Sequence, residues 1–99
     1  MIDIIAYDIE NDLLRTKTSK LLIRCGYHRV QYSVFIGVYR KSRRKKLWQS
    51  LVELLEKKEA TDSKLYSFQI TQPQLEKFRH IGPPPEFDYM LGRVHTIVI

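Results

Sequence analysis

The chain has 99 residues and a formal net charge of +6, from 17 lysines and arginines against 11 aspartates and glutamates. A single domain of this length has room for one core, which excludes a multidomain enzyme. Hydrophobic residues make up 43% of the chain, which excludes a disordered protein, and no apolar run approaches the roughly 18 to 20 residues of a membrane span. Since the first residues also lack the features of a signal peptide, we expect a cytoplasmic protein with no membrane partner.

The first third of the chain predicts a strand followed by a helix. Residues 2–7 form a short apolar run with a single charge, which is typical of a buried strand, and the strand is expected to end at Asp8. Asn11 and Asp12 are helix-capping residues, and Gly26 is suited to a left-handed helix end. Between these limits, one helical face carries Leu14, Thr18, Leu21, Leu22 and Cys25.

The middle of the chain predicts more β structure and a second helix. Residues 29–39 alternate between two faces with a period of two. They form either one long strand or two short strands joined by a kink near Tyr32 and Ser33, and both alternatives stay open. A helix is expected from about Ser42 to Lys58 with Trp48 in the core, and residues 64–70 alternate again as a strand.

The last third of the chain is less regular. Thr71, Gln72 and Pro73 favour a short helix through Arg79, and the prolines of residues 82–85 predict a stiff extended connection. Residues 94–99 are expected to form an apolar strand that needs a pairing partner. The order of elements predicts one α+β domain over residues 1–99 with the ferredoxin-like βαββαβ arrangement, in which 1–80 form the core and 81–99 an arm.

The usual metal-binding side chains show no zinc-site pattern. Cys25 is the only cysteine, which excludes an internal disulfide and a site built on several thiolates, and we expect it to pack in the core. The three histidines, His28, His80 and His95, lack the spacing of metal ligands. We therefore expect structural roles for these four residues.

Positive charge is concentrated in one part of the chain. Residues 13–52 contain no aspartate or glutamate and hold 11 of the 17 cations. A surface of mixed charge would be enough for solubility, so this segregation indicates binding to a polyanion, with nucleic acid as the expected partner. The cations are Arg15, Lys17, Lys20, Arg24, Arg29, Arg40, Lys41, Arg43, Arg44, Lys45 and Lys46.

The densest part of this stretch runs from Arg40 to Lys46, where β structure passes into a helix. The run matches a nuclear localisation signal as well as a contact with a phosphate backbone. We favour the phosphate contact.

Asp8 is the most informative acidic residue. A carboxylate between a strand end and a helix start is often only a helix cap, but Asn11 and Asp12 already supply caps. Mg²⁺ commonly binds one or two carboxylates and keeps water and phosphate as its other ligands. One aspartate alone supplies few ligands for a metal ion, whereas a two-fold dimer that paired two copies of Asp8 would form a credible metal site.

Three segments together resemble the CRISPR-associated Cas2 family: residues 4–9 (IIAYDI), 14–17 (LRTK) and 26–37 (GYHRVQYSVFIG). A strand that ends in Tyr-Asp, followed by an Arg-Val-Gln-x-Ser-Val-Phe segment, is quite specific to that family. The later predicted elements agree with the family in their order.

The resemblance implies a homodimer in which each terminal strand extends the partner's sheet, with a Mg²⁺ or Mn²⁺ site between two copies of Asp8. It also implies a catalytic neighbourhood at Asp8, Tyr7, Arg15, Arg29 and Phe35, and nucleic-acid contacts at Arg15, Lys17, Arg29 and Ser33. Ser33 on its own is a polar strand residue or a phosphate contact, and we favour the former.

Two functions follow from the resemblance. Members of the family are described as metal-dependent nucleases on RNA or DNA, and as the non-catalytic core that joins Cas1 integrase dimers during spacer acquisition. We therefore expect a protein of antiviral defence that binds prespacer DNA or RNA as a homodimer. The alternatives are a stand-alone, toxin-like ribonuclease of the same fold and a plain RNA-binding module, the latter disfavoured because the aromatic motif of sheet-based RNA readers is only faint here.

Overall fold

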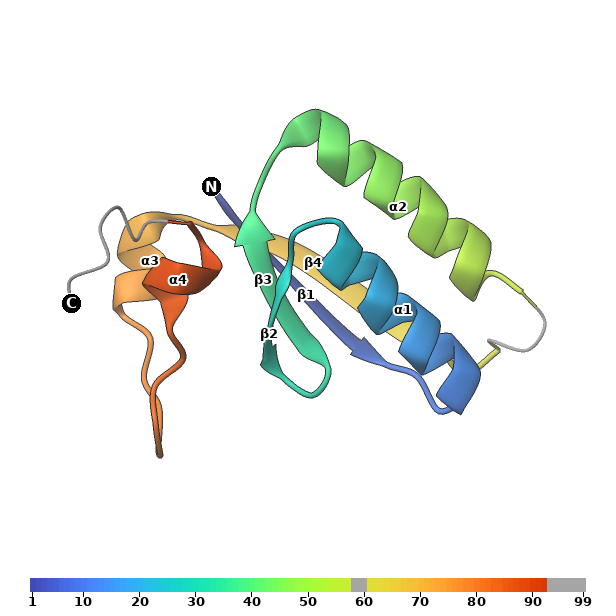
Figure 1. The fold of residues 1–99 in the computed structure, drawn as a ribbon, viewed down its shortest axis with the longest axis horizontal. Coiled ribbons are helices and arrows are strands. Elements are labelled where there is room, and N and C mark those ends of the chain that lie inside the picture. Colours follow the sequence, from blue (N-terminus) through green and yellow to red (C-terminus); the bar gives the residue numbers. More distant parts are fainter. Residues whose placement is uncertain (58–60, 93–99) are drawn as a thin grey trace.

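The computed structural model describes residues 1–57 and 61–92 of the chain (Figure 1). In chain order the elements are β1 (Ile2–Asp8), α1 (Asp12–Arg24), β2 (His28–Gln31), β3 (Val34–Val38), α2 (Lys41–Leu55), β4 (Lys64–Ile70), α3 (Gln72–Glu76) and α4 (Phe87–Met90).

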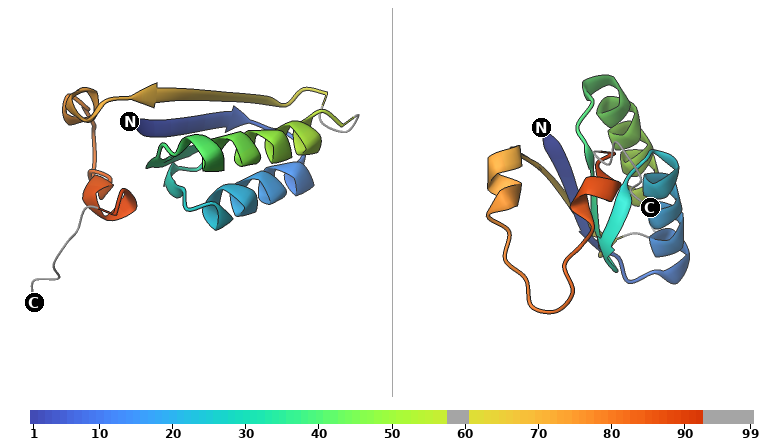
Figure 2. Two further views of the ribbon diagram at one scale, coloured as in Figure 1. Left: turned by 90° about the horizontal axis from the view of Figure 1, so that it is seen from above. Right: turned by 60° about the vertical axis from the view of Figure 1, so that its left-hand side comes forward.

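The four strands form one antiparallel sheet in the order β2-β3-β1-β4. Both long helices, α1 and α2, cover the same face of this sheet (Figure 2). This is the α+β, ferredoxin-like arrangement that the sequence predicts. The open question about residues 29–39 is resolved as two strands, which turn at Tyr32 and Ser33, with an irregular register between Arg29 and Gln31.

The boundaries of α1 follow from local chemistry. The side chain of Asn11 accepts a hydrogen bond of 2.9 Å from the backbone N–H of Leu14, and Asp12 lies at the positive end of the helix dipole. The helix gives way after Cys25 to Gly26, whose φ of 89° suits glycine best. Both ends were predicted, and they place the first turn of α1 directly after the end of β1.

The core has two parts, one on each face of the sheet. On the helix-covered face, Ile5, Tyr7 and Phe35 pack against Leu22 of α1 and Leu47 of α2. Cys25 is half-buried against this cluster, as expected. On the other face, the buried residues are Ile2, Ile36, Leu75 and Leu91.

The prediction that Trp48 lies in the core is wrong. Its side chain is 38% exposed, whereas Leu47 and Leu51 of the same helix are almost fully buried. Since neighbouring residues on a helix point about 100° apart, the two leucines take the inward positions and leave Trp48 at the margin of the packed face. There its ring lies 4.5 Å below the guanidinium of Arg44.

The last third differs from its prediction in two ways. Thr71 forms a capping box with Gln74, as its position predicts, but α3 ends at Glu76 rather than Arg79. The short helix α4 was not predicted. The expected strand over 94–99 lies outside the described residues. In the two described ranges, no helix is both long and apolar enough to cross a membrane.

Candidate nucleic-acid and metal site

Asp8 is exposed at the end of β1. Arg15 forms hydrogen bonds with the loop that follows β1. The Nη1 of Arg15 donates to the carbonyl oxygens of Ile9 and Glu10, at 3.0 and 3.3 Å. The guanidinium also forms an ion pair with Asp12, which raises the pKa of Arg15. The guanidinium is thereby held next to the strand end that carries Asp8.

Tyr32 connects Arg15 to Arg29, and it was not among the predicted site residues. The Nε of Arg15 donates to the Tyr32 hydroxyl at 3.1 Å, and the Arg29 guanidinium lies 5.7 Å from the centre of the same ring. The tyrosine ring is 66% exposed in the turn between β2 and β3. The sequence signal that could have indicated this role is an aromatic residue in a predicted kink, three positions after an arginine.

Tyr7 and Phe35 form the floor of this cluster rather than its surface. Their rings stack with centroids 6.0 Å apart, and both side chains are buried. The guanidinium of Arg29 lies 5.2 Å from the Phe35 ring. Burial raises the pKa of Tyr7, and the charge of Arg29 offsets part of that rise. These contacts fit a supporting role, and the proposed participation of both residues in catalysis stays a prediction.

Ser33 lies at the margin of the cluster, and Lys17 lies outside it. The carbonyl oxygen of Ser33 accepts a hydrogen bond of 3.0 Å from the backbone N–H of Tyr7, which ties the hairpin turn to the end of β1. Lys17 is exposed, but two residues along a helix correspond to about 200° of rotation. Its side chain therefore leaves α1 on a different side from that of Arg15.

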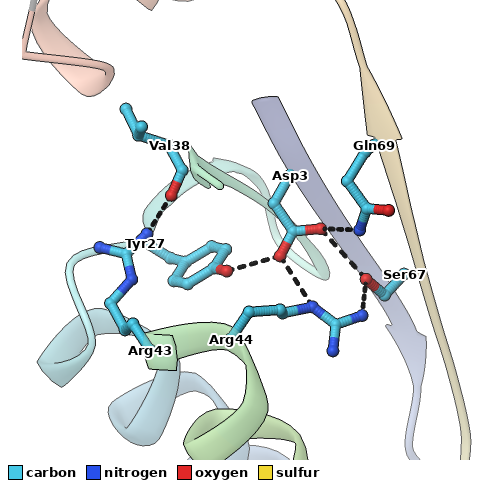
Figure 3. A network of polar contacts seen from close by, with 7 residues as sticks. All are labelled: Asp3, Tyr27, Val38, Arg43, Arg44, Ser67 and Gln69. Atoms are coloured by element: carbon cyan, nitrogen blue, oxygen red, sulfur yellow. Dashed lines mark hydrogen bonds and ion pairs between the residues drawn. The ribbon is translucent and has the colours of Figure 1, made fainter. Parts of the chain in front are cut away.

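The basic run from Arg40 to Lys46 divides into two groups. Arg43 and Arg44 are half-buried and bind other parts of the chain, as Figure 3 shows. Arg43 donates to the carbonyl oxygen of Val38 and its guanidinium lies 5.1 Å from the Tyr27 ring. The other four cations are exposed and available to a ligand: Arg40, Lys41, Lys45 and Lys46.

Arg44 forms an ion pair with Asp3 of β1, whose side chain is completely buried. Four side chains donate to Asp3: Arg44 at 3.0 Å, Tyr27 at 2.5 Å, Ser67 at 3.1 Å and Gln69 at 2.8 Å (Figure 3). A buried charge needs such partners. The contacts predicted for Arg43 and Arg44 with nucleic acid stay predictions, and both side chains have structural partners in this state.

The described residues contain no group of three or more histidine, cysteine, aspartate or glutamate side chains that could hold a metal ion. Asp8 is a single exposed carboxylate, opposite Lys64 in the register of β1 and β4. Mg²⁺ accepts one or two carboxylates together with water and phosphate, so Asp8 fits the ion as half of a site.

These features define a ferredoxin-like α+β protein with an arginine cluster beside a strand-end aspartate. A family model described as CRISPR associated protein Cas2 matches residues 1–78. The chain belongs to this family.

Curated relatives agree with the family assignment. A protein of Pyrobaculum aerophilum named CRISPR-associated endoribonuclease Cas2 2 is 31% identical over 83 residues, which cover 83% of this chain and 87% of the relative. A second, named CRISPR-associated endoribonuclease Cas2, from Aeropyrum pernix, is 41% identical over 51 residues, which cover 52% of this chain and 55% of that protein.

Solved structures share the fold. The crystal structure of Streptococcus pyogenes Cas2 at pH 6.5 has a TM-score of 0.69 at 16% identity, and the match covers 83% of this chain and all of that one. A hypothetical protein of Thermus thermophilus, TT1823, also has a TM-score of 0.69, at 26% identity, over 85% of this chain and 93% of its own.

Proposed function

We propose that the protein is a homodimeric, nucleic-acid-binding protein of CRISPR spacer acquisition, with metal-dependent phosphodiester cleavage as a further activity. The observation that carries the proposal is the cluster of Arg15, Tyr32 and Arg29 at the end of β1, the strand whose last residue is Asp8. Its ligand would be the phosphate backbone of DNA or RNA.

The cluster is suited to phosphate because its two guanidiniums are held before a ligand arrives. Arg15 is fixed by the carbonyls of Ile9 and Glu10 and by the Tyr32 hydroxyl. Arg29 is placed over the Tyr32 and Phe35 rings. A guanidinium presents paired donors that match phosphate oxygens, and a side chain that is already positioned loses less entropy on binding.

The sheet supports the proposed dimer. Its face opposite the two long helices carries Tyr66 and Phe68, which are 63% and 49% exposed. Nearby, Ile4, Ile36 and Phe78 line an apolar cavity of about 190 Å³. The strand β4 is also at the edge of the sheet, and its outer side has no paired strand among the described residues. Both the apolar face and the open edge favour burial against a second copy.

In the proposed dimer, the two copies of Asp8 bind a Mg²⁺ or Mn²⁺ ion at the two-fold axis. Bound there, the ion would polarise the scissile phosphate and activate water. Arg15 and Arg29 would orient the backbone and stabilise the charge that develops on the phosphate oxygens. Both curated relatives described above are named endoribonucleases, which supports this activity.

A role as a scaffold for a Cas1 integrase and prespacer DNA is favoured by a second observation. The cluster described above contains no histidine, and its one carboxylate, Asp12, is engaged by Arg15. Binding of a duplex by a dimer needs only the cationic surface, whereas hydrolysis also needs a group that accepts a proton from water.

One pair of variants tests the proposal. Arg29→Gln should weaken binding to a prespacer duplex and reduce its salt dependence, since a phosphate contact is lost. Asp8→Asn should keep duplex binding and lose divalent-dependent cleavage of RNA or DNA. Unchanged binding in Arg29→Gln would remove the cluster from the interface, and retained cleavage in Asp8→Asn would remove Asp8 from the chemistry. Co-purification with a Cas1 integrase and the duplex tests the scaffold role.

A further inference from the structure

A second cationic surface lies between the two long helices, away from the Arg15–Arg29 cluster. A groove with a volume of about 440 Å³ runs between α1 and α2. Its lining residues come from one row on each helix: Lys17, Lys20, Leu21 and Arg24 from α1, and Ser50, Glu53, Leu54 and Lys57 from α2 and its end.

The groove carries a net positive charge. Its four cations and one carboxylate, Glu53, give a formal charge of +3. All five charged side chains are exposed, and within residues 1–57 and 61–92 no ion pair joins any of them to an opposite charge. Like charges gathered along one groove repel one another, so the arrangement favours an anionic ligand.

The spacing of the cations suits a row of phosphates. Lys17, Lys20 and Arg24 follow one another at three and four residues, which places them on one face of α1 over about 10 Å of its axis. Successive phosphates on one strand of duplex DNA advance by about 3.4 Å along the axis. The three side chains therefore span about three phosphate steps.

The groove is a different surface from the cluster beside Asp8. Arg15 lies about 200° around α1 from Lys17, and it points toward the hairpin turn, where it binds Tyr32. The groove faces α2 instead. Figure 1 shows the two helices running in opposite directions, with the start of α1 beside the end of α2, so Lys57 adds its charge at the Lys17 end.

We propose that the α1–α2 groove is a second binding surface for the phosphodiester backbone of a nucleic acid. This inference rests on the proposed function, because it extends the same ligand to another face of the molecule. Lys17, Lys20 and Arg24 bind phosphates along one strand, Ser50 donates from its hydroxyl, and Glu53 limits the affinity by its negative charge.

The test measures binding of a short, labelled DNA duplex to the full chain by fluorescence anisotropy over a series of KCl concentrations. Lys20→Gln/Arg24→Gln should weaken binding about tenfold and lower the slope of log K against log salt by about 1.8, from two phosphate contacts at about 0.9 each. Lys77→Gln/Arg79→Gln removes the same lysine and arginine charges from exposed positions outside the groove, and should change the slope by much less.

Two further variants separate charge from folding. Lys20→Arg/Arg24→Lys should retain the slope, since it keeps both charges in the groove. Glu53→Gln should tighten binding about threefold, because it removes the single repulsive charge, and damage to the fold would not have that effect.

An unchanged slope in Lys20→Gln/Arg24→Gln would overturn the inference, as would an equal loss in the matched control outside the groove. The Arg29→Gln variant keeps the two proposals distinguishable. If Arg29→Gln loses affinity and the groove variant does not, the proposed function stands and the second surface is rejected.

Discussion

Arg44 and Asp3 are 41 residues apart in sequence, yet the Nε of Arg44 lies 3.0 Å from a carboxylate oxygen of Asp3 beneath the N-terminal half of α2. The same carboxylate accepts from Tyr27, Ser67 and Gln69. One buried side chain therefore joins β1, β4, α2 and the segment before β2.

This arrangement predicts a large loss of stability when Asp3 is changed. Asp3→Asn keeps the shape but removes the charge that Arg44 needs, and breaking a buried pair in this way should lower the free energy of unfolding by about 3 kcal/mol. Urea denaturation followed by circular dichroism measures the loss. Glu10→Gln, at an exposed carboxylate, is the control and should stay within about 0.5 kcal/mol of the parent chain. Equal stability of Asp3→Asn and the parent would show that the pair contributes nothing.

The stability of the fold should decline in alkaline solution. Burial raises the pKa of Tyr27, and the hydrogen bond to Asp3 and the charge of that carboxylate raise it further. The folded chain then keeps a proton that the unfolded chain releases near pH 10, so the contribution is complete below about pH 10 and is lost as the pH rises above it. The free energy of unfolding measured from pH 8 to pH 11 should fall accordingly.

Tyr27→Phe tests whether Tyr27 causes this alkaline loss of stability. It should cost about 1 kcal/mol at pH 8, through the lost hydrogen bond to Asp3, and its stability should fall less steeply above about pH 10. The pKa of Tyr7 is raised in the same direction, so some decline should remain. An identical slope in the parent and in Tyr27→Phe would exclude Tyr27 as a source.

Tyr32 should contribute to nucleic-acid binding by holding Arg15 and Arg29. Tyr32→Phe loses only the hydrogen bond from Arg15, so binding should weaken about fivefold, whereas Tyr32→Ala also loses the contact with Arg29 and should weaken it by about tenfold or more. Duplex titration measures both. Tyr66→Phe, an exposed tyrosine on the opposite face of the sheet, is the matched control. Equal affinities for all three variants would contradict the positioning role.

Residues 94–99 should be needed for the proposed dimer. Deleting them should leave the exposed edge of β4 without the partner strand that the family resemblance implies, and give monomers or aggregates by light scattering. A stable dimer of the shortened chain would show that dimerisation does not depend on strand exchange.

Local features of the structure were predictable because short-range chemistry determines them. Asn11 and Gly26 mark the ends of α1, and the turn at Tyr32 and Ser33 lies where the alternation allowed a kink. Such signals need only neighbouring residues. The sheet order followed from the order of the elements.

Features that depend on distant packing were not predictable. Arg43 and Arg44 have the same sequence signature as Lys45 and Lys46. Contacts with other parts of the chain, Val38 for Arg43 and Asp3 for Arg44, leave the two arginines half-buried, whereas the two lysines are exposed. The role of Tyr32 was not predictable for the same reason, since it depends on Arg15, which lies 17 residues before it. The basic composition indicated nucleic acid as the ligand, while the tertiary structure decides which lysines and arginines are free to bind it.

The proposed metal site requires two copies of Asp8 to share one divalent ion, and the stoichiometry of Mn²⁺ binding tests this directly. Titration of the full chain followed by electron paramagnetic resonance should give one bound Mn²⁺ for every two chains, no binding in Asp8→Asn, and unchanged binding in the control Asp62→Asn. One Mn²⁺ for each chain, or binding that survives Asp8→Asn, would contradict the shared site.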